Sequence, residues 1–249
     1  MITVKLVPAI LLALALALAP APLAAQTPPI QPEQRQAIET VIREYLLAHP
    51  EVIRQAVQAL QQRAHQAELD QSNAAVQQHQ DELFADAEAP VLGNSAGDVT
   101  IVEFFDYRCP YCKQMEPGLA ELVKEDGKIR LVMKEFPILG PDSTTASRAA
   151  LAARAQGRYQ ALHDALIQQK GGLDDAAIYR VAASVGVDVD RLKRDMTAPA
   201  IDEALKRNHD LAMAIGIGGT PALVIGKQFV AGALDKAGLK SMVEQARRE

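Results

Sequence analysis

Residues 99–112 read VTIVEFFDYRCPYC. An apolar run typical of a buried strand leads directly into a Cys-Pro-Tyr-Cys motif, and a helical pattern follows it. A helix that begins at Cys109 places this thiol beside unpaired backbone N–H groups, which favour a thiolate over a thiol. Cys109 and Cys112 then lie on one helical turn, where they can form a disulfide with little backbone movement. The stretch therefore predicts a redox centre at a strand–helix junction.

The rest of the chain continues as an α/β pattern in which a helical block interrupts a sheet domain. The catalytic domain is expected over residues 99–249, with the helical insertion at about 142–215. The expected elements, in order, are a strand at 99–105, a helix at 109–124, a strand at 129–136, the inserted helices, a hairpin at 221–230 and a closing helix at 235–248.

The segment before this domain is expected to be helical. Between residues 26 and 86 the chain is rich in Gln, Ala, Glu and Arg, and a break is expected at His49-Pro50. Its apolar stripe is too narrow for a globular core, so the segment either pairs with copies of itself or lies on the catalytic domain. We favour self-association, with dimer and trimer both open. Residues 87–98 are expected to form a linker. The stripe consists of Ile38, Ile42, Leu46, Leu47, Ile53, Val57 and Leu60.

Residues 1–25 have the layout of a secretory signal peptide, with a positive start, an apolar stretch of about 13 residues and a small-residue end. That stretch is shorter than the roughly 20 residues needed to span a bilayer, so a retained anchor is the weaker alternative. No cysteine stands directly after the expected cleavage point, which disfavours a lipid anchor. We therefore expect an exported protein.

The two cysteines are the only ones in the chain, and a structural role is the weaker interpretation. A disulfide across two intervening residues constrains the unfolded chain little, and a chain of this length can build a core without it. A zinc site is disfavoured because the motif supplies two of four ligands. The histidines are scattered and are expected at the surface or packed in the core: His49, His65, His79, His163 and His209. We expect no metal site and no cofactor.

The charge balance disfavours a nucleic-acid partner. The net charge is −5 and the isoelectric point is near 5.6. The chain has no tryptophan and few other aromatic residues, so it offers no platform for stacking bases. The composition fits a soluble exported protein.

From Asp98 to the C-terminus the chain resembles the DsbA-like branch of the thioredoxin fold. The resemblance rests on the strand, the Cys-Pro-Tyr-Cys motif, the inserted helices and Gly218-Gly219-Thr220-Pro221 before a hairpin. With the N-terminal helical segment included, the chain is similar to the ScsC proteins, which are periplasmic disulfide isomerases with an N-terminal oligomerisation segment. The resemblance implies a thioredoxin fold with an inserted helical domain, a periplasmic location and a homo-oligomer, with a trimer favoured.

Each residue of the motif has an expected role. Cys109, at the helix start, is expected to attack a substrate disulfide, and Cys112, one turn further in, to resolve the mixed disulfide. Pro110 suits the first helical turn, where its missing N–H would be unpaired in any case. The preceding Asp106, Tyr107 and Arg108 either tune the thiolate or are solvated loop residues.

Glu103 is expected below the thiols, because strand alternation places it on the same face as Ile101 and Phe105. A buried acid with a raised pKa can accept a proton from the resolving thiol. Members of the fold also have an acid at this position. The alternative is a carboxylate paired with a lysine, and Lys134 on the neighbouring strand is the candidate.

Thr220 and Pro221 form the expected substrate ledge. The resemblance implies that this peptide bond is cis and faces the two thiols, leaving the preceding backbone free to pair with an extended substrate. Thr220, in place of an aliphatic residue, resembles the isomerase-like members. The motif Glu135-Phe-Pro-Ile-Leu-Gly-Pro141 is expected to be a strand end and a hinge into the helical block.

The sequence is compatible with three functions. The first and favoured one is a disulfide isomerase or reductase for misfolded or disulfide-bearing exported proteins, kept reduced by a membrane thiol reductase. The second is a monomeric DsbA-like dithiol oxidase. The third is a copper-binding thiol protein, because the resemblance includes a family linked to copper tolerance and thiols bind Cu(I).

Tyr111 sets an expectation for the redox potential. The strongest oxidases of this branch have Pro-His between the cysteines, whereas this chain has Pro110-Tyr111. Tyrosine lacks the imidazole that can place positive charge beside the thiolate. We expect the dithiol couple to be less oxidising than a Pro-His couple. A redox titration that gives a potential as high as that of the strongest oxidase of the branch would contradict this.

Overall fold

The computed structural model describes residues 31–248, so the expected signal peptide lies outside the described part of the chain. The chain divides into two compact units, residues 1–58 and residues 59–249. Among the described residues, no helix combines the length and the apolar character needed to cross a membrane.

The described part of the first unit consists of α1 (Pro32–Ala48) and the beginning of α2 (Glu51–Gln78). The two helices are separated at His49-Pro50, which confirms the expected break. The helix α1 has no buried residue, although apolar side chains repeat along it at helical spacing. Its exposed large apolar side chains are Ile38, Val41, Ile42, Tyr45 and Leu47. Most of these lie on one face of α1, and within residues 31–248 that face is exposed.

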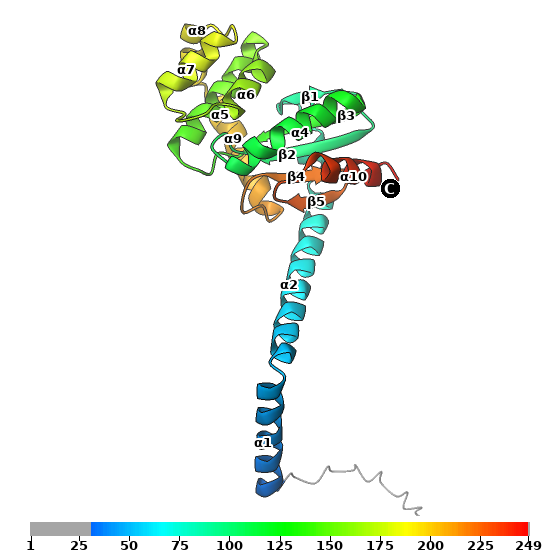
Figure 1. Cartoon of the computed structure of the whole chain (residues 1–249). Helices are drawn as coiled ribbons and strands as arrows, with labels where there is room; N and C mark the ends of the chain where they lie inside the picture. The colour runs from blue at the N-terminus through cyan, green and yellow to red at the C-terminus, as the bar shows by residue number, and fades with distance from the viewer. Residues whose placement is uncertain (1–30, 249) are drawn as a thin grey trace, which may run out of the picture. The chain divides into compact units, whose positions relative to one another are not determined.

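The second unit is built on a five-stranded mixed sheet (Figure 1). The strand order is β1-β3-β2-β4-β5; β2 and β3 are parallel, and the other neighbours are antiparallel. The strands are β1 (Val91–Gly93), β2 (Val99–Phe105), β3 (Ile129–Glu135), β4 (Ala222–Ile225) and β5 (Gln228–Ala231). The central strand β2 is buried along almost its whole length, which explains its nearly continuous apolar sequence.

Helices cover both faces of the sheet. On one face α4 (Pro110–Asp126) and α10 (Lys236–Ala246) pack on Ile101, Phe105 and Leu223. On the other face the end of α2, α3 (Gln80–Phe84) and α9 (Pro199–Ala214) pack on Val102 and Phe104. Alternate residues of β2 therefore enter two separate cores, as the period of a strand requires.

The helical insertion lies between β3 and β4. Its helices are α5 (Pro141–Ala153), the 3₁₀ turn η1 (Arg154–Gln156), α6 (Tyr159–Ile167), α7 (Asp175–Ser184), α8 (Val189–Asp195) and α9. Asp174 and Asp188 cap α7 and α8 by accepting hydrogen bonds from the backbone N–H groups of Ala177 and Arg191. The architecture confirms the expected thioredoxin fold with an inserted helical domain.

Candidate active site

The two thiols lie where β2 gives way to α4. Cys109 is the N-cap of α4 and Pro110 is its first residue, as the sequence predicts. The backbone N–H of Cys112 points at Cys109 Sγ at 3.5 Å, so the cap also acts as an acceptor for the helix end. Cys109 is 4% exposed and Cys112 is 1% exposed, so the first thiol is the more accessible of two buried ones.

The loop before β4 brings Thr220 to the thiols. Cys109 Sγ donates a hydrogen bond to the carbonyl oxygen of Thr220 at 3.2 Å, across 111 positions of sequence. The Thr220–Pro221 peptide bond is cis, as the resemblance implies. The structure therefore places the expected nucleophile and the expected substrate ledge in direct contact.

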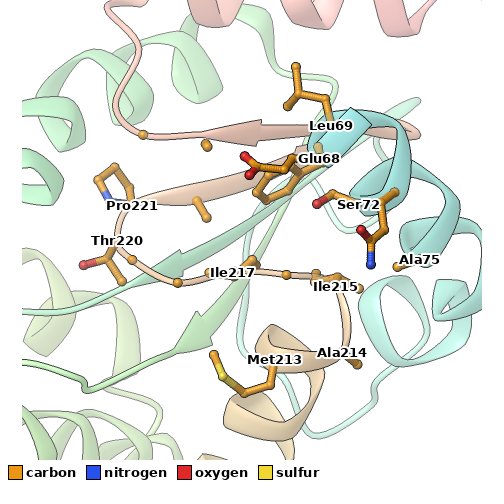
Figure 2. Close-up of a pocket in the computed structure, with 18 of the residues that line it drawn as sticks. Glu68, Leu69, Ser72, Ala75, Met213, Ala214, Ile215, Ile217, Thr220 and Pro221 are labelled. Atoms are coloured by element: carbon orange, nitrogen blue, oxygen red, sulfur yellow. The ribbon is translucent and has the colours of Figure 1, made fainter. Parts of the chain in front are cut away.

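A pocket of about 480 Å³ lies beside this loop. Figure 2 shows Thr220 and Pro221 on the loop, Met213 at the end of α9, and Leu69 and Ser72 on α2. Four large apolar side chains are exposed on the motif, on the hinge after β3 and at this pocket: Tyr111, Ile138, Leu139 and Met213.

Cys112 is strongly shielded. Burial raises the pKa of its thiol well above the ordinary value, and the nearby Glu103 and Cys109 raise it further. A backbone hydrogen bond involving Asp106 opposes these effects only in part. Cys112 therefore stays protonated near neutral pH, and its attack on a disulfide needs a group that takes its proton.

Glu103 lies buried in the core below the thiols, at 1% exposure, as the sequence predicts. Burial raises the pKa of its carboxyl well above the ordinary value of 4.5, and the charges of Glu116, Glu135 and Cys109 raise it further. Its Oε2 atom has no hydrogen-bond partner. This carboxyl has the burial and the raised pKa that a proton acceptor needs.

The suggested pairing of Glu103 with Lys134 is wrong. The parallel register aligns Glu103 with Met133 and Phe104 with Lys134, so Lys134 follows Phe104 to the opposite face of the sheet. There its Nζ donates to Asp86 Oδ2 at 2.6 Å.

Asp106 is buried and accepts several hydrogen bonds. The sequence allowed either a solvated loop residue or one that tunes the thiolate, and the structure rules out the solvated one. Asp106 is fully buried, and its Oδ1 accepts from the backbone of Arg108 at 2.7 Å and from Ser143 Oγ at 2.7 Å. Its Oδ2 accepts from the backbone N–H groups of Ile138 and Leu139 at 2.9 and 3.0 Å. One carboxylate thus joins the thiol loop, the hinge after β3 and the first turn of the helical insertion.

Glu135, the last residue of β3, is a further buried carboxylate. Tyr107 and Tyr159 donate to its Oε1 at 3.0 Å each, and Ser147 donates to its Oε2 at 2.7 Å. Burial raises the pKa of Glu135 to about 7, while the three donors and the nearby His163 limit the rise. Tyr107, which the sequence also left open as a solvated residue, is therefore a core residue of this network.

Sequence reasoning missed Glu116, Glu135, Tyr159 and His163. Glu116 had a usable signal, because it follows Cys112 by four positions and so shares its helical face. The others lie on β3 or in the insertion, and only the fold brings them to the site.

Three comparisons with known proteins agree with this geometry. The model of the DSBA-like thioredoxin domain matches residues 100–244, and the model of the copper resistance protein ScsC N-terminal domain matches residues 34–67. The chain belongs to the DSBA-like thioredoxin domain family, whose members are thiol-disulfide oxidoreductases, and it carries in addition an ScsC-type N-terminal segment.

Two solved structures illustrate the likeness. A thioredoxin-like oxidoreductase from Silicibacter pomeroyi is 45% identical with a TM-score of 0.67, and the match covers 68% of this chain and 98% of that one. ScsC of Proteus mirabilis in a transitional conformation is 30% identical with a TM-score of 0.66, and the match covers 88% of this chain and 99% of that one.

Curated relatives include longer proteins. An Na⁺/H⁺ antiporter NhaA of Salinispora tropica is 31% identical over 137 residues, which are 54% of this chain and 21% of the antiporter. This chain spans between a fifth and a quarter of the length of the first such relatives.

The buried Glu103 predicts a pH-dependent stability. The pKa of Glu103 is higher in the folded protein than in the unfolded chain, so above pH 4.5 the folded state binds more protons than the unfolded state. The free energy of unfolding that Glu103 contributes therefore falls as the pH rises. Glu103→Gln removes this contribution. We expect urea unfolding between pH 4.5 and pH 8 to show a smaller loss of stability with rising pH in the variant than in the wild type.

Burying the glutamine amide changes the free energy of unfolding by the same amount at every pH. It shifts the plot of this free energy against pH without changing its slope, so the slopes of the two proteins are compared. The exposed Glu203 offers the matched control, and Glu203→Gln should follow the wild-type curve. Parallel curves for wild type and Glu103→Gln would contradict the raised pKa.

Proposed function

We propose that this protein is an oligomeric disulfide isomerase or reductase that acts on exported proteins through Cys109 and Cys112. The carrying observation is the 3.2 Å contact between Cys109 Sγ and the carbonyl of Thr220, which precedes the cis proline. It sets the more exposed of the two thiols, at a helix N-terminus, beside backbone that an extended client can pair with.

The proposed reaction starts when Cys109 releases to solvent the proton that its Sγ donates to the Thr220 carbonyl, which leaves a thiolate. It attacks one sulfur of a client disulfide, so that a mixed disulfide forms and the other client sulfur leaves as a thiolate. In isomerisation, a different client thiolate attacks the mixed disulfide, which forms a new client disulfide and returns Cys109 as a thiolate. No net electrons are transferred in that cycle.

The reductive branch uses Cys112 and Glu103. Glu103, in its carboxylate form, takes the Cys112 proton, and the Cys112 thiolate attacks Cys109 Sγ. The client sulfur leaves as a thiolate, which takes up a proton from solvent, and the two cysteines become a disulfide. Two electrons from an external dithiol, supplied by a membrane thiol reductase, then return the pair to its reduced form.

The proposed client surface includes the exposed apolar side chains around the thiols. Tyr111, Ile138, Leu139 and Met213 offer contacts to unfolded or misfolded chains, which expose apolar residues. The pocket beside Thr220 and Pro221 offers space for a client side chain next to the proposed ledge.

The N-terminal helices support the oligomeric part of the proposal. The apolar face of α1 is exposed in the single chain, and burying it against copies of itself removes that surface from water. The match of residues 34–67 to the ScsC N-terminal domain supports the same role. We propose a trimer, because the resemblance to the ScsC proteins implies one. We propose residues 26–86 as the oligomerisation segment, residues 87–98 as the linker and residues 99–249 as the catalytic domain.

The proposed location is the periplasm, reached by a signal peptide at residues 1–25. A copper-binding role is less well supported. The family model with copper resistance in its description matches residues 34–67, and neither cysteine lies in that range.

Single-cysteine variants test the assigned roles. Cys112→Ser removes the proposed resolving thiol, so mixed disulfides between Cys109 and client proteins should accumulate. Cys109→Ser removes the nucleophile, so it should trap almost none and should lose activity on scrambled ribonuclease. Non-reducing electrophoresis after alkylation measures the trapped species. Equal trapping by both variants would contradict the assignment of the nucleophile.

A substitution on α1 tests the oligomer and the reaction direction together. Ile42→Asp places a charge on the apolar face, and we expect its mass in solution to fall from about three chains to one. Thr40→Asp, about half a helical turn away, adds the same charge and should leave the mass unchanged. The monomeric variant should lose recovery of scrambled ribonuclease while keeping thiol oxidation. A monomeric wild type would instead support the oxidase alternative.

A further inference from the structure

Three candidate metal ligands lie together between α4 and α6, apart from the two thiols. Glu116 of α4 meets His163 and Asp164 of α6, and one ligand atom from each lies within 4.8 Å of the others. Glu116 and His163 are buried, at 6% and 0% exposure, and Asp164 is half-buried. None of these three side chains takes part in the proposed thiol-disulfide reaction.

His163 turns an unpartnered nitrogen into the cluster. Its Nε2 is buried without a hydrogen-bond partner and lies 3.8 Å from Glu116 Oε1. Its other nitrogen, Nδ1, lies 3.0 Å from the hydroxyl of Tyr107. Because Tyr107 donates its single proton to Glu135, the Tyr107 oxygen is left to accept from His163 Nδ1–H.

This arrangement fixes which nitrogen is free to bind an ion. A neutral imidazole with its proton on Nδ1 carries a lone pair on Nε2, and here the lone pair faces two carboxylates. A hydrogen bond that orients the remote nitrogen of a ligating histidine is typical of metal sites in proteins.

The spacing fits a small cation after a modest adjustment. Zinc bonds to nitrogen and carboxylate oxygen are about 2.0–2.2 Å long, so two donors of a tetrahedral zinc ion lie roughly 3.4 Å apart. His163 Nε2 and Glu116 Oε1 are 3.8 Å apart, so a small closure of this pair brings both atoms to bonding distance of one ion. Rotation of the half-buried Asp164 side chain brings in the third donor.

The cluster is also reachable and has no competing cationic partner. Glu116 and Asp164 both line a cavity of about 950 Å³, which provides an entry path. Lys113 lines the same cavity, but its Nζ donates to the carbonyls of Ile167 and Gln169 at 3.1 and 2.9 Å. Within residues 31–248, no lysine or arginine forms an ion pair with either carboxylate.

We propose that Glu116, His163 and Asp164 bind one divalent transition-metal ion of the zinc type, with water completing its coordination. One imidazole and two carboxylates suit zinc, whereas magnesium and calcium prefer oxygen ligands alone. The site lies one helical turn from Cys112 and is distinct from the thiols.

Zinc titration of untagged protein in the Cys109→Ser, Cys112→Ser background tests the site without competition from the thiols. Competition with a chromophoric chelator measures stoichiometry and affinity. We expect one Zn²⁺ per chain, displaced weakly or not at all by excess Mg²⁺. Glu116→Gln and Asp164→Asn, added separately, should each weaken binding at least about tenfold.

Asp175→Asn, at an exposed position of α7, is the matched control and should bind zinc as the background does. Circular dichroism checks the fold of each variant, and the half-buried Asp164 keeps the test decisive if Glu116→Gln fails to fold. Absence of zinc binding, or equal binding in the Asp164→Asn and Asp175→Asn variants, would overturn the proposal.

Discussion

The antiparallel pairing of β2 with β4 is the constraint on which the thiol site depends. It aligns Phe104 with Ala222, so the residues just beyond β2 and just before β4 emerge at the same edge of the sheet. Cys109 and Thr220 thereby meet although 111 positions separate them. Because β2 is also paired with β3 on its other side, neither partner of this contact can shift without disturbing the centre of the sheet.

Three buried carboxylates lie on β2, directly after it and at the end of β3, and their hydrogen bonding differs. Asp106 accepts four hydrogen bonds from the groups around it. Glu135 accepts three, from two tyrosines and a serine, and still has a raised pKa because it is fully buried. One oxygen of Glu103 has no hydrogen-bond partner, and burial raises the pKa of this carboxyl well above its ordinary value. Of the three carboxyls, Glu103 therefore has the fewest hydrogen bonds to offset its burial. It is also the group that accepts the Cys112 proton in the proposed reaction.

Much of this arrangement follows from local sequence patterns. The strand before the motif, the cap at Cys109 and the burial of Glu103 depend on alternation and helix-end chemistry, which a short stretch of sequence displays. The partner of Lys134 was not predictable in that way, because it depends on the register between β2 and β3. The partners of Tyr107 were hidden for a related reason. They include His163, which is 56 positions away in the insertion, and no periodic pattern encodes that contact.

The hydrogen bonds of Asp106 also bear on how the helical insertion moves. Ser143 lies in the first turn of α5, and Ile138 and Leu139 lie in the hinge that leads to it. A swing of the insertion about that hinge would strip a buried charge of three donors at once, at a cost of several kcal/mol. The insertion and the loop that carries Cys109 are therefore coupled through a single side chain, the Asp106 carboxylate. A displacement of Ser143 would reach the backbone of Arg108, next to Cys109, through that one group.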